Sequence, residues 1–348
     1  MATTDASTIA CALNELIAGR IDQCPQEALP SLVGDLLCEI VDNRLDNLPL
    51  PGGGATLERW RVLAAVAAHD LSLLKLYEAH TDALAILGEA GVTDIPPLSV
   101  WGVWCAEPPG AVLRARRLAA EGALALDGEK RWCSGARFAT HALISYRDEQ
   151  RRSCLAAVDL GQDGIVVEDD AWKAIGMAAT RTATLRFTGV HATPVGAPGF
   201  YLERPGFWHG AIGIAAGWFG AAAALAEKLR QALHNRNDPH GLAHLGEIDC
   251  QLSGALNQLR EAARFIDTHP ATITARLALS SRLQAEVAAQ AVLAHVGRAL
   301  GPAPYCLDRH SARILADLPV FLRQSHAERD LAQLGALSME SEESPWQL

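Results

Sequence analysis

The sequence lacks several features that define common classes of protein. Its eight cysteines stand singly, with no Cys-x-x-Cys pair, so we predict neither a zinc site nor a disulfide framework but reduced thiols. Basic residues are outnumbered, with 30 Lys and Arg against 40 Asp and Glu, and the formal charge of −10 disfavours nucleic acid and anionic membranes as partners. Aromatic residues make up only 5% against 49% hydrophobic residues overall, a composition typical of an Ala- and Leu-rich helical protein.

Long hydrophobic runs are also missing. The segment from Met1 to Ala12 carries Asp5 and no basic residue, so it does not have the pattern of a secretory leader. The longest uncharged run lies between His209 and Glu227, is mostly Ala and Gly, and falls short of the ~20 apolar residues that a membrane-spanning helix needs. We therefore expect a cytoplasmic protein without a membrane segment, in which this run forms a buried helix.

Composition changes twice along the 348 residues, which exceed the usual size of one domain. We predict an N-terminal helical domain over 1–97, a β domain over 98–198, a C-terminal helical bundle over 206–337 and an acidic tail over 338–348. The fold class is therefore mainly α with a central antiparallel β barrel or sandwich and a C-terminal four-helix bundle.

The helical zones are predicted from apolar residues at three- and four-residue spacing. The loop from Pro49 to Gly54 cannot be helical, and a new helix is expected to start at Thr56 and continue through Leu76. In the last zone, long helices are expected between breaks at 235–239, 269–270 and 301–304.

The middle zone consists of short apolar runs separated by Gly, Asp and Arg clusters, which is typical of strands. Period-two alternation is clearest over 183–188, where Ala183, Leu185 and Phe187 are expected inside and Thr184, Arg186 and Thr188 outside. The other expected strands are Leu98–Trp104, Leu124–Leu126, Ala142–Tyr146 and Cys154–Val158.

Four segments carry family-like motifs. They are Trp104-Cys105-Ala106-Glu107-Pro108-Pro109-Gly110, Gly128-Glu129-Lys130-Arg131-Trp132-Cys133-Ser134-Gly135, Ala174-Ile175-Gly176-Met177 leading to Leu185–Val190, and Leu300-Gly301 leading to Arg313 and Asp317. With the order of helices, strands and helices, they resemble the acyl-CoA dehydrogenase superfamily across roughly residues 57–335. The resemblance implies FAD bound between the β domain and the bundle, and a homodimer or homotetramer in which a neighbouring subunit completes the cofactor site.

The resemblance also assigns cofactor-binding residues. Trp132 would lie beside the flavin ring, with a core-filling role as the alternative, and the Ser134 hydroxyl would donate to flavin N5 or O4. Arg236 would reach the diphosphate of a partner's FAD, with a solvated loop charge as the alternative, and Gly301 would permit close approach to the cofactor. The full set is Trp104, Cys105, Ala106, Trp132, Cys133, Ser134, Arg236 and Gly301, with Ala106 standing where the family has threonine.

The catalytic carboxylate of the family does not carry over. Ser325 stands at the usual glutamate, and Gly210 at the alternative base position on the first bundle helix. His326 and His209 are the nearest residues that could take a proton near neutral pH, so the candidate catalytic residues are His326, His209 and Ser325.

Three functions remain open at this stage. The first is an FAD-dependent oxidoreductase that oxidises an acyl thioester or related carbonyl compound with a relocated base, removing the α-proton, transferring hydride to flavin N5 and passing electrons to an electron-transfer flavoprotein. The second is a dehydrogenase-like monooxygenase that uses O2 and reduced flavin from a flavin reductase, and the third is a non-catalytic scaffold of the same fold. His240 and His244 have the spacing of two helix ligands, but only Glu247 lies near them in sequence, so no metal site is expected.

Overall fold

The computed structural model describes residues 6–118, 122–169, 172–234, 236–340, 343–344 and 346–347. The chain divides into two compact units. Unit 1 combines residues 23–48 with 72–207, and unit 2 combines 5–22, 49–71 and 208–348. Part of the expected acidic tail lies outside the described residues, and helix α12 continues two residues into it, to Met339.

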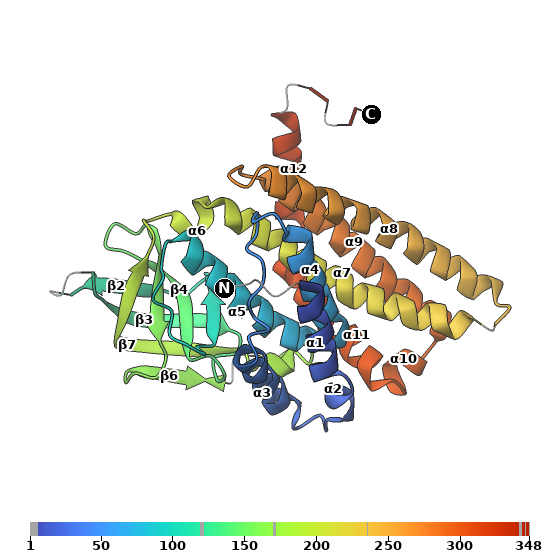
Figure 1. Cartoon of the computed structure of the whole chain (residues 1–348), viewed down its shortest axis with the longest axis horizontal. Helices are drawn as coiled ribbons and strands as arrows, with labels where there is room; N and C mark the ends of the chain where they lie inside the picture. Colours follow the sequence, from blue (N-terminus) through green and yellow to red (C-terminus); the bar gives the residue numbers. More distant parts are fainter. Residues whose placement is uncertain are drawn as a thin grey trace. The chain divides into compact units, whose positions relative to one another are not determined.

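Helices occupy both ends of the chain (Figure 1). Before the strands they are α1 (Ala6–Ile17), α2 (Arg20–Gln23), α3 (Leu29–Asp42), α4 (Thr56–His69) and α5 (Leu71–Glu89). After the strands they are α6 (Phe200–Glu203), α7 (Pro205–Leu233), α8 (Pro239–Thr268), α9 (Ala275–Leu300), α10 (Ala303–Cys306), α11 (Arg309–Phe321) and α12 (Glu328–Met339), with short 3-10 turns η2 (Ala178–Thr180) and η3 (Leu322–Gln324).

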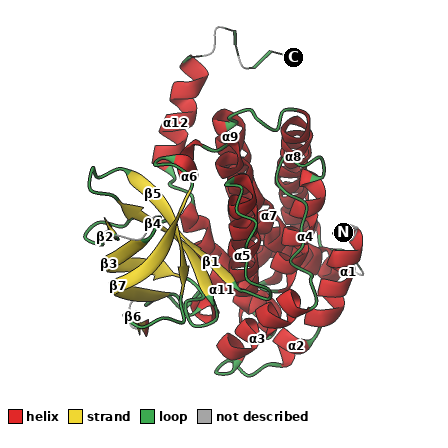
Figure 2. Cartoon of the chain, turned by 60° about the vertical axis from the view of Figure 1, so that its left-hand side comes forward, coloured by secondary structure: helices red, strands yellow, loops and turns green. Residues whose placement is uncertain are grey.

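Seven strands form one sheet in unit 1 (Figure 2). The order is β1-β4-β2-β3-β7-β5, β6 pairs with β7, and β5 pairs back onto β4, which closes the sheet into a barrel. Most pairings are antiparallel as expected, but β1 and β2 both run parallel to β4. The strands are β1 (Trp101–Trp104), β2 (Leu113–Arg117), β3 (Leu124–Cys133), β4 (His141–Arg147), β5 (Ser153–Asp159), β6 (Ile165–Glu168) and β7 (Ala183–Val195).

Strand β1 separates two apolar cores of unit 1 because its side chains alternate between the two faces of the sheet. Trp104 points into the barrel core with Leu126, Ile144 and Phe187. Trp101 packs on the other face, in a cluster that includes residues of α5.

Helix α7 is long and apolar enough to cross a membrane by length and composition, but 67% of its most apolar window is buried inside the protein. It behaves as the buried helix expected from the sequence. At Gly220 a Cβ atom would lie 2.3 Å from the carbonyl oxygen of Ala64, so glycine is what allows α7 to contact the backbone of α4.

Several sequence predictions differ from the structure in detail. The expected helix over Thr56–Leu76 is interrupted at Asp70, which has an extended backbone conformation between α4 and α5. Thr184 is buried rather than exposed, at the position of β7 that pairs with Glu168 of β6. Strands β2 and β6 were not expected, since the arginine-rich β2 and the four-residue β6 lack a clear alternating pattern.

Candidate functional site

The end of β3 turns a tryptophan out of the barrel. The pairing of β3 with β7 shifts register between Lys130 and Cys133, which marks a bulge. Within it Trp132 has φ of +60°, in the left-handed region that a bulky side chain rarely adopts, and its side chain is 54% exposed. Cys133 points into the barrel core, so the core-filling alternative for Trp132 is wrong.

The end of β1 lies beside this bulge. The indole Nε1–H of Trp104 donates to the main-chain oxygen of Ser134 at 3.0 Å, so the first two family-like motifs meet in space. Trp104 is itself buried in the barrel core, and Cys105 packs on the opposite face of the sheet near Tyr201. Only Ala106 of this trio is exposed, so Trp104 and Cys105 are positioned to support a ligand site rather than to line it with their side chains.

A chain of hydroxyl groups ends at Ser134. The Thr180 Oγ1 lies 2.7 Å from the main-chain oxygen of Met177, a group that only accepts, so the single hydroxyl proton of Thr180 is used there. The Thr182 Oγ1 lies 2.8 Å from Thr180 Oγ1, and because the Thr180 proton is already used, Thr182 must donate to Thr180. The Ser134 Oγ lies 2.8 Å from Thr182 Oγ1, so Ser134 must in turn donate to Thr182.

The direction of this chain corrects the expectation that Ser134 donates to a ligand. Its proton is committed to Thr182, and its outward lone pairs can only accept. An exposed indole next to a hydroxyl acceptor fits a flat heteroaromatic ring that carries an N–H group, which is a fair description of one edge of a flavin.

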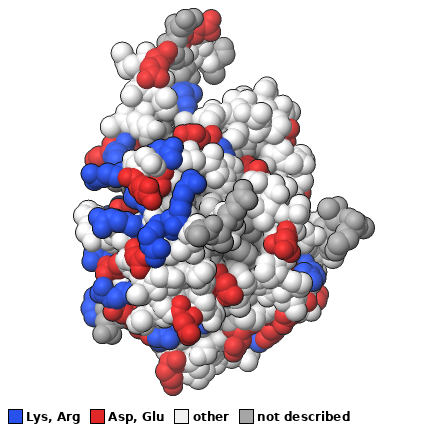
Figure 3. Space-filling view, turned by 90° about the vertical axis from the view of Figure 1, so that its left-hand side faces the viewer, with Lys and Arg blue, Asp and Glu red and all other residues white. Residues whose placement is uncertain are grey.

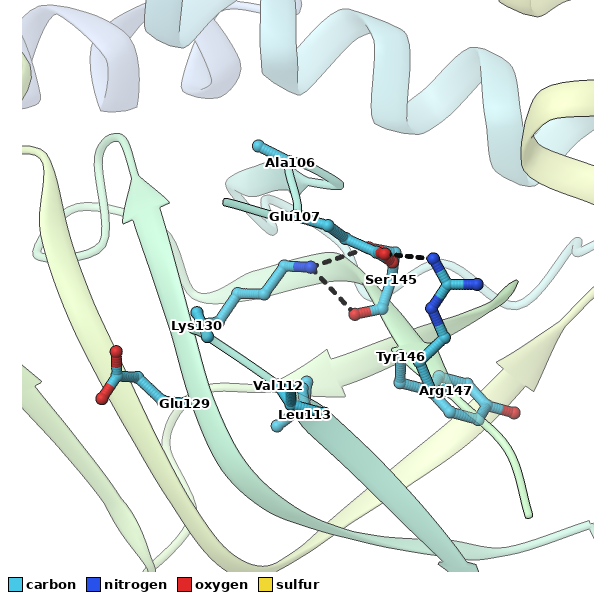
Figure 4. Close-up of a pocket in the computed structure, with 10 residues that line it drawn as sticks. Ala106, Glu107, Val112, Leu113, Glu129, Lys130, Ser145, Tyr146 and Arg147 are labelled. Atoms are coloured by element: carbon cyan, nitrogen blue, oxygen red, sulfur yellow. Dashed lines mark hydrogen bonds and ion pairs between the residues drawn. The ribbon is translucent and has the colours of Figure 1, made fainter. Parts of the chain in front are cut away.

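The buried Lys130 supports the loop after β1 through Ser145 (Figure 4). Lys130 Nζ donates to the main-chain oxygen of Ser145 at 3.0 Å and to its Oγ at 2.7 Å. Ser145 Oγ lies 3.3 Å from both the Cys105 oxygen and Glu107 Oε1, and Glu107 forms an ion pair with Arg147. Glu107, Lys130, Ser145 and Arg147 line a pocket of about 70 Å³, which is far smaller than the ~300 Å³ that small-molecule sites usually need.

Burial shifts the pKa values of two groups in this interior. Desolvation lowers the pKa of the Lys130 ammonium. It raises the pKa of the Cys105 thiol to about 12, so this thiol is uncharged at neutral pH.

The outer surface of the β domain carries mixed charge. Figure 3 shows Lys and Arg gathered there with Asp and Glu between them. Arg186 pairs with both Glu129 and Glu168, and Arg137 with Asp169. The interleaving of opposite charges gives this surface no strong preference for an anionic partner.

In unit 2 the predicted histidines differ in environment. His209, in the first turns of α7, is 1% exposed and lies against the loop at Gly52, where a Cβ would come within 3.6 Å of its Nδ1. His326 is 57% exposed at its side chain, with Nδ1 3.3 Å from Asp330 Oδ1. A histidine oriented by a carboxylate is suited to proton transfer, so His326 keeps its candidate role.

Ser325, next to His326, is buried at the turn between η3 and α12. This turn is held by Arg282 of α9, which donates to the main-chain oxygens of Ala211 and Gln324 at 2.7 and 3.0 Å and stacks on Trp218 at 4.8 Å. Arg282 therefore ties the start of α7, near His209, to the segment that carries Ser325.

Arg236 and Gly301 lie elsewhere in unit 2. Arg236 is exposed after the end of α7, and Gly301, with φ of +63°, ends α9. Gly301 follows Arg282 by 19 residues, which corresponds to about 28 Å of helix. Within one chain Gly301 therefore cannot contact the same small ring as Ser325, which lies next to the Gln324 oxygen that Arg282 holds.

One histidine of the His240–His244 pair faces a third histidine on another helix. His244 Nδ1 lies 2.8 Å from His295 Nδ1 on α9. Among the described residues, no group of three or more His, Cys, Asp and Glu side chains is placed to hold a metal ion.

Sequence reasoning missed the residues that support the site. The sequence presents Lys130 only as part of the β3 motif, and it assigns no role to Arg282, Thr180 or Thr182. An arginine inside a largely apolar helical stretch, such as Arg282, is a weak indication of a buried cation, whereas Lys130 lies between two other charged residues and its sequence context gives none. The threonines gave no indication, because their role depends on the fold of the loop over 172–182.

Comparisons with known proteins find the fold but no sequence family. No family model matches the chain, and no curated protein matches its sequence. Solved structures match over almost the whole length. Methanesulfinate monooxygenase from Pseudomonas fluorescens is 19% identical with a TM-score of 0.76, covering 98% of this chain and 97% of that one.

Two further structures extend the comparison. The FMN-bound structure of TdsC, the dibenzothiophene monooxygenase of a Paenibacillus species, is 17% identical with a TM-score of 0.74, covering 98% and 97%. A probable acyl-CoA dehydrogenase from Mycobacterium abscessus is 15% identical with a TM-score of 0.79, covering 96% and 98%. The chain therefore has the acyl-CoA dehydrogenase-like fold, with N-terminal helices, a central β barrel and C-terminal helices, which confirms the predicted fold class and the resemblance at the level of the fold.

Proposed function

We propose that this protein is a flavin-dependent monooxygenase that takes up reduced flavin mononucleotide and uses O2 to oxygenate a small organic substrate. One oxygen atom goes to the substrate and the other to water, with both electrons supplied by the reduced flavin. When bound, the reduced flavin would supply the two electrons that react with O2. The monooxygenase, an alternative given by the sequence, is thus preferred to the FAD-dependent oxidoreductase acting on an acyl thioester.

One observation carries this proposal. The β domain keeps an exposed aromatic and a hydroxyl edge at Trp132 and Ser134, whereas neither base position supplies a carboxylate. Ser325 and Gly210 stand at those positions, and an unactivated hydroxyl at its ordinary pKa cannot remove the α-proton of a thioester. A monooxygenase needs no such base.

The neighbours in fold space support the same choice. Two of the three described above are monooxygenases by name, and the one solved with a bound flavin holds FMN. We therefore propose FMN in place of the FAD implied by the sequence resemblance. A flavin reductase is the proposed source of reduced flavin, and the homo-oligomeric state stays a prediction.

Within unit 2, His326 stays the candidate for proton transfer, because its imidazole is oriented by Asp330. Trp132 would contact the flavin ring, and Trp104 holds the Ser134 backbone in place.

The experiment mixes the protein anaerobically with photoreduced FMN and then with oxygenated buffer. The protein is expected to change the rate at which reduced FMN is oxidised relative to free flavin. With ¹⁸O₂ and a panel of small sulfur and indole compounds, an oxidised product should carry one ¹⁸O atom. Anaerobic bleaching of bound oxidised flavin by an acyl thioester would instead establish a dehydrogenase, and no binding of any flavin would favour the scaffold.

A further inference from the structure

The buried hydroxyl chain restricts what Ser134 can bind. Thr180 and Thr182 are both buried, so water cannot replace either partner and reverse the direction of the chain. Each hydroxyl has one proton, and the oxygen of Met177 at the far end only accepts. The outward side of Ser134 is therefore a hydrogen-bond acceptor.

A flavin changes its hydrogen-bonding character with redox state. In the oxidised ring N5 carries a lone pair and accepts, whereas in the reduced ring N5 carries a hydrogen and donates. At N5, which the resemblance gives together with O4 as the position facing Ser134, an acceptor pairs with the reduced ring and opposes the oxidised one, because two facing acceptors leave both groups unsatisfied.

We propose that Thr180 and Thr182 are specificity-determining residues that make the site select reduced over oxidised flavin through Ser134. This inference rests on the proposed function and adds a mechanism for choosing the redox state of the flavin. Neither threonine needs to contact the ligand. They are positioning residues that act through the proton of Ser134.

Removing the Thr180 hydroxyl should reverse the chain. In Thr180→Val, the Thr182 proton loses its acceptor and can turn to Ser134 Oγ, which frees the Ser134 proton to point outward. Ser134 can then donate to oxidised N5, and the preference for the reduced ring should fall or reverse. Thr180→Ser keeps the hydroxyl and should keep the preference.

The test compares dissociation constants for oxidised and photoreduced FMN, the latter under anaerobic conditions, in each variant. The wild type is expected to bind the reduced form about tenfold more tightly, and Thr180→Val and Thr182→Val to lose most of that ratio. A tenfold ratio corresponds to a rise of about 30 mV in the two-electron potential of the bound flavin, which gives a second measurement. Thr193→Val, on an exposed position of β7, is the matched control and should leave the ratio unchanged.

The outcomes separate this inference from the proposed function. If neither flavin form binds, the proposed function fails. If the wild type binds both forms equally, or if Thr180→Val folds and keeps the wild-type ratio, the inference is overturned while a flavin site remains; equal binding would fit contact with the N3–H group, which both redox states carry. If Thr180→Val does not fold, Ser134→Ala decides, because loss of the acceptor must also abolish the ratio.

Discussion

The indole of Trp104 and the main-chain oxygen of Ser134 are joined by a 3.0 Å hydrogen bond that connects the exit of β1 to the exit of β3. This bond links two motifs that lie 30 residues apart in the sequence. It anchors the backbone that carries Trp132 and Ser134 to the barrel core, in which Trp104 is buried. The candidate site therefore depends on a buried tryptophan as much as on the exposed one.

Loss of this bond should affect both stability and ligand binding. Trp104→Phe leaves the Ser134 carbonyl without its donor, and the free energy of unfolding should fall by about 1–3 kcal/mol in urea denaturation. Trp101→Phe is the matched control, since its indole donates to Ser99 Oγ at the other end of β1. Both variants should lose stability, but only Trp104→Phe should weaken FMN binding; equal effects on FMN would contradict the assigned role.

The backbone conformation of Trp132 should lower the free energy of unfolding. Its φ of +60° costs about 1–3 kcal/mol of backbone strain, which glycine would relieve. Glycine also gives the unfolded chain more conformational freedom, which offsets about 1 kcal/mol of that gain. Trp132→Gly is therefore expected to leave the free energy of unfolding unchanged or slightly higher, while FMN binding falls at least about tenfold.

Arg151 provides the control for this prediction. It has φ of +62° in the exposed turn between β4 and β5. Arg151→Gly should relieve similar strain with no effect on FMN. A large loss of stability in Trp132→Gly would show that the indole packs into the protein instead of serving a ligand.

The buried Lys130 should make stability depend on alkaline pH. Desolvation lowers its folded pKa, so between that value and the unfolded pKa of ~10.4 the unfolded chain binds more protons than the folded one. The contribution of Lys130 to the free energy of unfolding therefore rises with pH in this interval, and below it both states are charged. Urea denaturation from pH 7 to 10 should show the wild type gaining stability relative to Lys130→Met. A difference that stays constant with pH would mean that the ammonium is not desolvated.

Arg282 should be essential to the turn that carries Ser325. Arg282→Met removes two charged hydrogen bonds to main-chain oxygens and the stacking on Trp218, with an expected loss of about 3 kcal/mol in the free energy of unfolding. Arg298→Met, at an exposed position of the same helix, should change it by less than about 0.5 kcal/mol. Similar losses in the two variants would contradict this role.

The sequence by itself determined the order of helices, strands and helices, the β3 motif around Trp132 and the absence of a carboxylate at Ser325. These features follow from periodicity, turn residues and local spacing, which act over short stretches of chain. Only the tertiary structure decided that Trp132 faces outward, that Trp104 supports Ser134, and that β2 and β6 are strands, since each depends on pairing partners far away in the sequence. The tertiary structure also decided the direction in which the Ser134 hydroxyl donates, because the Met177 carbonyl imposes that direction through Thr180 and Thr182. A hydroxyl group can donate or accept, and its role is fixed only when folding brings its partners within hydrogen-bonding distance.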